Sequence, residues 1–177
     1  SGLRPTRIRF KIPTTMKEMK KEEYKEARRE FDRTAAELKK EVRQEAREAY
    51  TEVKKEASDR MKRIDEELRE TVRPEKALDD GCSRHHIREA REAARKAKDD
   101  VNLEVITARA DFDDEKADFR DDIADARRKM RDDTQTGTVI AKTYDISDRA
   151  QRAKDEIDAD RLDSLERMDR IGRDIDR

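Results

Sequence analysis

The chain has 177 residues, of which 51% are charged, 32% hydrophobic and 4% aromatic. Lys and Arg number 45 and Asp and Glu number 46, so the net charge is −1. So few large apolar residues cannot fill an α/β or all-β core of this size. One Cys excludes a disulfide scaffold, and no apolar run is long enough to span a bilayer. The class that remains is all-α, with long polar helices.

The first element in chain order is a basic segment, residues 1–13, which contains no acid and ends at Pro13. Cationic and apolar side chains alternate along it as Arg7, Ile8, Arg9, Phe10, Lys11 and Ile12. This period of two predicts an extended arm, which would bind another protein by adding a strand to a sheet edge. The Val139–Ile140 stretch of the same chain is an alternative partner. The arm has no apolar core of a secretory signal, so we expect a cytoplasmic or virion-associated protein.

Three helices are predicted to follow, over residues 14–72, 84–133 and 145–177. Pro and Gly interrupt helices, and outside the arm they are concentrated in the intervening segments. The break at 73–83 contains Pro74, an Asp-Asp-Gly turn signal and Ser83, which could cap the next helix. The linker at 134–144 is rich in Thr.

Apolar residues recur every eleven positions along the first two helices, as in the row Phe31, Val42, Val53 and Ile64. Eleven residues in three turns give about 3.67 residues per turn, so we predict a hendecad coiled coil with a shallow right-handed supercoil. The expected oligomer core consists of Phe31, Leu38, Val42, Val53, Ile64, Leu68, Val101, Phe112, Phe119 and Ile123.

Charges of opposite sign flank this apolar stripe. On one side of the first helix, eleven of the thirteen flank positions between residues 26 and 70 are acidic, while the other side is basic, and the second helix has the same handed arrangement. In a parallel ring of identical helices, the acidic flank of one would meet the basic flank of the next. We therefore expect a parallel homo-oligomer. An intrachain hairpin is the alternative, which the flank charges oppose weakly because like flanks would meet.

Few residues suggest chemistry. Cys82, His85 and His86 cluster in the first break, but a structural zinc site needs four ligands, so metal binding stays open only if several chains contribute. No phosphate-binding loop, nucleophile elbow or zinc-protease motif is present. We expect no enzyme activity and no cofactor. Nucleic acid is not an expected partner, because the helices are charge-balanced and no basic face wide enough for a duplex is evident.

These features predict a structural protein: a homo-oligomeric rod or collar anchored through residues 1–13 to other proteins of a large assembly, such as a phage or virion. The 11-residue period across about 24–130 is similar to that of late-embryogenesis-abundant proteins and exchangeable apolipoproteins. That resemblance implies the alternative function, action on lipid surfaces or protection during desiccation. The chain departs from these families in its large aromatics at stripe positions, namely Phe31, Phe112 and Phe119.

Overall fold

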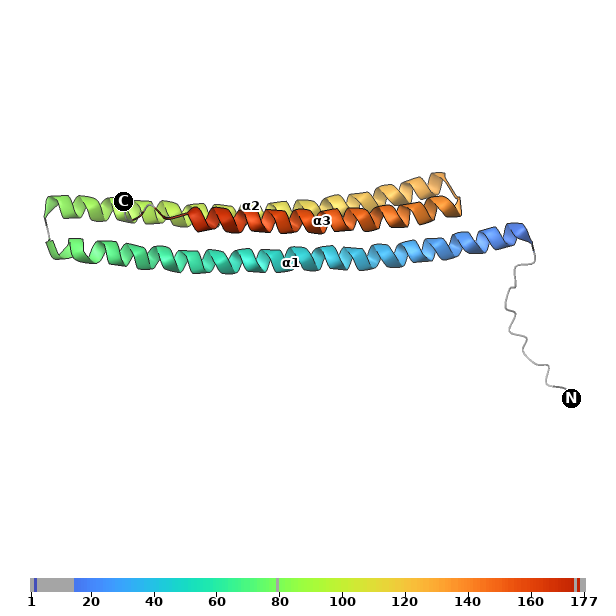
Figure 1. The fold of residues 1–177 in the computed structure, drawn as a ribbon, viewed down its shortest axis with the longest axis horizontal. Coiled ribbons are helices and arrows are strands. Elements are labelled where there is room, and N and C mark those ends of the chain that lie inside the picture. The colour runs from blue at the N-terminus through green and yellow to red at the C-terminus, as the bar shows by residue number, and fades with distance from the viewer. Residues whose placement is uncertain (1, 3–14, 79, 174, 176–177) are drawn as a thin grey trace.

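The computed structural model describes residues 2, 15–78, 80–173 and 175, and folds them into one bundle of three long helices (Figure 1). The helices are α1 (Met16–Leu78), α2 (Gly81–Asp132) and α3 (Thr136–Arg170), and no strand occurs in these ranges. The all-α class is confirmed. The arm at 1–13, with Arg7 to Ile12, lies outside the described residues apart from Gly2, which is exposed.

Helix α1 has 63 residues, which corresponds to about 95 Å at a rise of 1.5 Å per residue. Helix α2 runs back along it and α3 reverses again, so α1 and α3 are parallel and α2 is antiparallel to both (Figure 1). Helix α3 has only 35 residues and ends short of the α1–α2 turn, so two helices alone form that tip of the rod.

The first break is shorter than the sequence predicts. Helix α1 continues through Pro74 to Leu78, because the only backbone bond that Pro74 removes would reach the carbonyl of Glu70, an exposed residue whose carbonyl water can satisfy. Helix α2 then starts at Gly81 with Asp80 as its N-cap. The Asp80 carboxylate accepts a 2.7 Å bond from the Ser83 N–H, so the prediction that Ser83 caps this helix is wrong.

The predicted Thr-rich linker at 134–144 is also mostly helical, and α3 begins at Thr136 instead of 145. The turn is compact because the Asp133 carboxylate accepts bonds from the Gln135 N–H at 3.1 Å and the Thr138 hydroxyl at 2.8 Å. Val139 is fully buried, seven residues before the buried Ile146, so the apolar stripe of α3 starts inside the supposed linker. Val139–Ile140 is therefore helical and does not form a strand for the arm.

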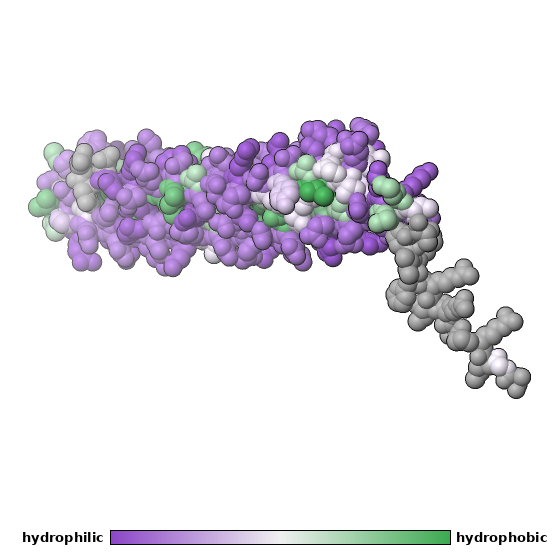
Figure 2. Space-filling model, turned by 45° about the vertical axis from the view of Figure 1, so that its right-hand side comes forward, coloured by the Kyte–Doolittle hydropathy of each residue, from purple (hydrophilic) through white to green (hydrophobic). Residues whose placement is uncertain are grey.

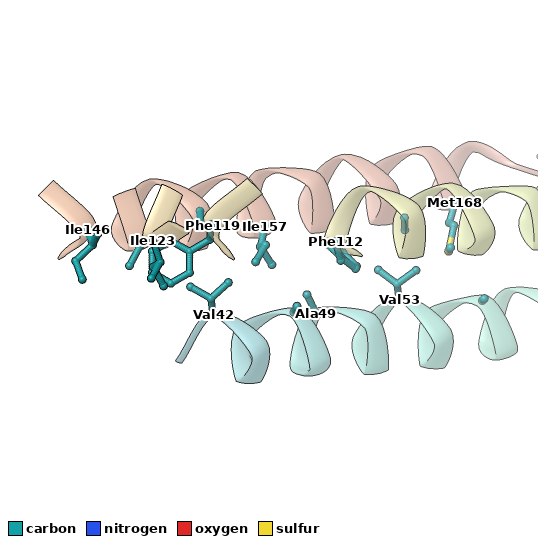
Figure 3. Packing of buried hydrophobic residues seen from close by; sticks show 14 of the residues in the cluster. Val42, Ala49, Val53, Phe112, Phe119, Ile123, Ile146, Ile157 and Met168 are labelled. Carbon is teal, nitrogen blue, oxygen red and sulfur yellow. The ribbon is translucent and has the colours of Figure 1, made fainter. Parts of the chain in front are cut away.

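One apolar core runs along the axis of the bundle. Figure 3 shows Val42 of α1 pointing toward Phe119 and Ile123 of α2, with Ile146 and Ile157 of α3 beside them. Ten of the 24 buried residues in this cluster are Ala, so the larger side chains supply more buried apolar area per residue.

The predicted oligomer core lies inside a single chain. Of its ten members, Leu38 and Leu68 are half-buried at the edge of the core, and the other eight are fully buried against the chain's own helices. The hairpin alternative is thus the observed arrangement, and the stripe is not available as the core of a parallel ring. Either arrangement would bury the stripe. The flank charges are too weak to prevent the hairpin, because an exposed charge pair contributes only about 0.2–1 kcal/mol, whereas burying a Phe or Ile side chain contributes about 1.5–3 kcal/mol.

The end of α3 is held by an arginine that the stripe pattern did not assign. Arg60 is only 5% exposed, and its Nε donates a 2.7 Å hydrogen bond to the carbonyl of Ile171, to which its Nη2 also donates. The chain then turns at Gly172, where φ is +81° and the backbone lies against Ile64. Arg60 thereby caps α3, which ends at Arg170 and not at 177.

Candidate interaction surface

The direction of each helix decides which charged flanks meet. Helices α1 and α2 are antiparallel, and their basic flanks face each other. Helices α2 and α3 are also antiparallel, and acids of α2 lie beside acids of α3. Helices α1 and α3 are parallel, and opposite charges meet there: Lys154 Nζ lies 2.7 Å from Glu41, and Arg161 lies 3.0 Å from Glu52. Folding thus sorts the charges into a basic, an acidic and a mixed groove.

The groove between α1 and α2 is lined by cations from both helices. We name as the basic seam the residues Lys39, Arg43 and Arg47 of α1 and Arg109, Lys116 and Arg120 of α2. Two adjoining hollows of about 140 and 280 Å³ share Arg43 and Lys116. The only acid that lines them is Asp113, 3.0 Å from Lys116 Nζ. The side chains of the other five cations make no ion pair or hydrogen bond with any residue of the described ranges.

Tyr50 lines the larger of the two hollows, beside Arg47 and Arg109 at one end of the basic seam, and is half-buried. Lys54 Nζ lies 4.8 Å from the centre of its ring, and Arg109 Cζ lies 5.6 Å from it. Cation–π attraction therefore offsets part of the repulsion between these two cations. At its two ends, the basic seam is closed by ion pairs between α1 and α2, namely Lys98 with Asp65 and Arg127 with Asp32 at 3.6 Å.

The groove between α2 and α3 has the opposite sign. We name as the acidic seam the residues Asp111, Glu115 and Asp118 of α2 and Glu156, Asp160 and Asp163 of α3. Burial, together with the neighbouring acids, raises the pKa of Glu115 and of Asp160 above the ordinary carboxyl value. Burial is the largest cause of both shifts, and Arg167 offsets part of the negative charge around Asp160.

Ion pairs also bracket the acidic seam. Arg149 Nη1 lies 3.0 Å from Asp122 at one end, and Arg167 Nε lies 2.8 Å from Glu104 at the other. The hydrogen bond to Glu104 raises the pKa of Arg167, which stays charged at every physiological pH. Each seam therefore has a core of like charge between two interhelical ion pairs.

The two-helix tip carries a second group of cations. Arg84, Arg88, Arg91 and Arg95 lie along one side of α2 and line a hollow of about 480 Å³ beside Lys76 of α1. The side chains of the four arginines make no ion pair or hydrogen bond within the part of the chain that the structure describes. The sequence analysis did not single out this row, although the spacing of 4, 3 and 4 residues places the four on one helix face.

The three side chains considered as metal ligands do not converge within one chain. Cys82 is an exposed free thiol, His85 Nε2 lies 2.9 Å from Glu89, and His86 Nδ1 lies 3.8 Å from Glu75 on α1. The two imidazole centroids are 6.4 Å apart. Among the described residues, no group of three or more His, Cys, Asp or Glu side chains is placed to hold a metal ion.

The rest of the surface seen in Figure 2 is mostly hydrophilic, with small, scattered apolar areas. No helix in the described ranges combines the length and the hydrophobicity that a bilayer crossing needs. Comparisons with protein-family models, with curated proteins and with solved structures find no match for this chain. The features of this chain that bear on function are therefore its two seams and its rod shape.

Proposed function

We propose that the protein is a non-enzymatic structural component that associates with copies of itself and with other proteins of a larger assembly. The observation that supports this proposal best is the division of surface charge into a basic and an acidic seam on one rod. Each seam carries charges that the chain itself leaves uncompensated, and compensation from outside would favour side-by-side contact.

The rod geometry suits such a role. A bundle about 95 Å long, with one continuous core, is a stiff spacer, and the 11-residue period would keep its hendecad coiled-coil packing nearly straight. In this proposal the arm at residues 1–13 anchors the rod to another protein. Long polar helices combined with an extended arm are also the basis for proposing a virion component, including one of a phage.

The lipid-surface alternative has less support. A lipid-binding helix needs an apolar face that is free to enter the bilayer, whereas Phe31, Phe112 and Phe119 are buried in the bundle. Opening the bundle would expose this apolar face only by separating the helices and exposing the buried side chains of the core to water.

Solution mass tests the proposal. Light scattering across a dilution series, at about 0.05 M and 0.5 M NaCl, should show an oligomer that dissociates on dilution and at high salt, because salt screens exposed charge. A monomer at every concentration in low salt would contradict self-association. A parallel measurement with lipid vesicles separates the alternative, since binding to vesicles without self-association would favour the lipid-surface function.

A further inference from the structure

We infer that the basic seam of one chain docks against the acidic seam of a second copy, so that neighbouring rods lie side by side. This inference rests on the proposed self-association and names the two surfaces that perform it. The partner is another copy of this chain, because the same molecule carries both members of the charge pair.

The first argument is that intrachain contacts leave both seams unsatisfied. In the basic seam, the side chains of five of the six cations make no ion pair or hydrogen bond among the described residues, and Arg43 and Arg47 are exposed. In the acidic seam, Glu156 and Asp163 are exposed beside the partly buried Asp160. Apart from Asp113 beside the basic seam and Arg167 beside the acidic seam, few charges of opposite sign lie at these surfaces, so an outside surface of opposite sign would complement each seam.

The second argument is position along the rod. The basic seam uses Arg109 to Arg120 of α2, and the acidic seam uses Asp111 to Asp118 of the same helix. Both seams therefore lie at one level of the axis, on opposite flanks of α2. Two rods placed side by side without an axial shift bring the cationic stretch of one next to the acidic stretch of the other.

The third argument is the type of interface. A contact between two different surfaces of identical chains is heterologous, and each added copy presents a free seam for the next. Such a contact generates a ring if it closes and a sheet or bundle of rods if it does not. The net charge of −1 removes the long-range repulsion that would oppose this growth.

The test is charge reversal with complementation. One variant, R43E/R120E, makes the basic seam acidic, and a second, E156K/D163K, makes the acidic seam basic. All four residues are exposed, so circular dichroism should show unchanged helicity. At low salt, each variant alone should associate at least about tenfold more weakly than the wild type in sedimentation equilibrium, whereas an equimolar mixture of the two should associate again.

The tip arginines provide the matched control. R88E/R91E reverses two exposed arginines on α2 and changes the net charge as much as R43E/R120E does, but it lies outside both seams. It should leave association within about twofold of the wild type. Loss of association in this control, or failure of the complementary mixture to associate, would overturn the seam assignment.

The remaining outcomes separate the seam inference from the proposed function. If the wild type is oligomeric and both seam variants stay oligomeric, self-association holds but uses another surface, so the seam inference fails alone. If the wild type is monomeric at low salt, both fail. Binding of a monomeric wild type to a single-stranded oligonucleotide, lost in R43E/R120E and kept in R88E/R91E, would assign the basic seam to a polyanion and overturn docking between copies.

Discussion

Replacement of Phe119 by Ala should destabilise the monomer by about 3–5 kcal/mol. Phe119 is 1% exposed and belongs to the core cluster, so removal of its ring leaves a cavity that the surrounding side chains fill only in part. Val42 and Ile123 beside it (Figure 3) would lose packing partners. A domain of this size typically has a free energy of unfolding of about 5–15 kcal/mol, so this single residue accounts for a large fraction of it.

The assay is urea unfolding followed by circular dichroism at 0.5 M NaCl, where contacts between copies are screened. The midpoint should stay constant over a hundredfold dilution, because the Phe119 side chain is buried within one chain. A core formed between chains would instead lose about 2.7 kcal/mol of apparent stability over that dilution.

The matched control is Ile106→Ala, at a residue of α2 that is 65% exposed. Its free energy of unfolding should stay within about 0.5 kcal/mol of the wild type. A loss below about 1 kcal/mol in Phe119→Ala, or an equal loss in both variants, would refute the placement of Phe119 in the intrachain core.

Three further variants test the ends and the seams of the rod. Arg60→Ala should lower the free energy of unfolding by about 2 kcal/mol and speed amide exchange in the last turn of α3, because the Ile171 carbonyl loses both side-chain donors. Unchanged exchange there would exclude a capping role. Gly172→Ala should lower the free energy of unfolding, measured in urea, by about 1–2 kcal/mol, since φ is +81° and the added Cβ would lie 3.1 Å from Ile64 Cγ1. Glu115→Gln should raise the free energy of unfolding at pH 7 by up to about 1 kcal/mol in dilute protein. The pKa of Glu115 is raised in the folded state, so its negative charge destabilises the fold at pH values above that pKa. The gain in free energy of unfolding from Glu115→Gln should therefore disappear as pH falls through the carboxyl range. An equal gain at pH 4 would contradict this cause.

The amino-acid sequence by itself determined the class of the fold and the burial of its large side chains. The composition leaves only long helices, and the eleven-residue rows identified eight side chains that are fully buried in the bundle. The sequence also indicates the unusual position of Arg60 on the apolar face. The row Ala27, Leu38 and Ala49 continues eleven residues later at position 60, where an Arg stands on the apolar face and caps α3. Periodicity and charge order are local properties, which is why one chain suffices to predict them.

Only the tertiary structure decided which surfaces face each other. An apolar stripe specifies that it must be covered, but a helix of the same chain and a helix of another chain bury it equally well. Charge pairs could not settle this choice from the sequence, because each exposed pair contributes only tenths of a kcal/mol against several for a buried ring. Once α2 folds back on α1, like flanks must meet, and both the basic and the acidic seam follow from that reversal of direction.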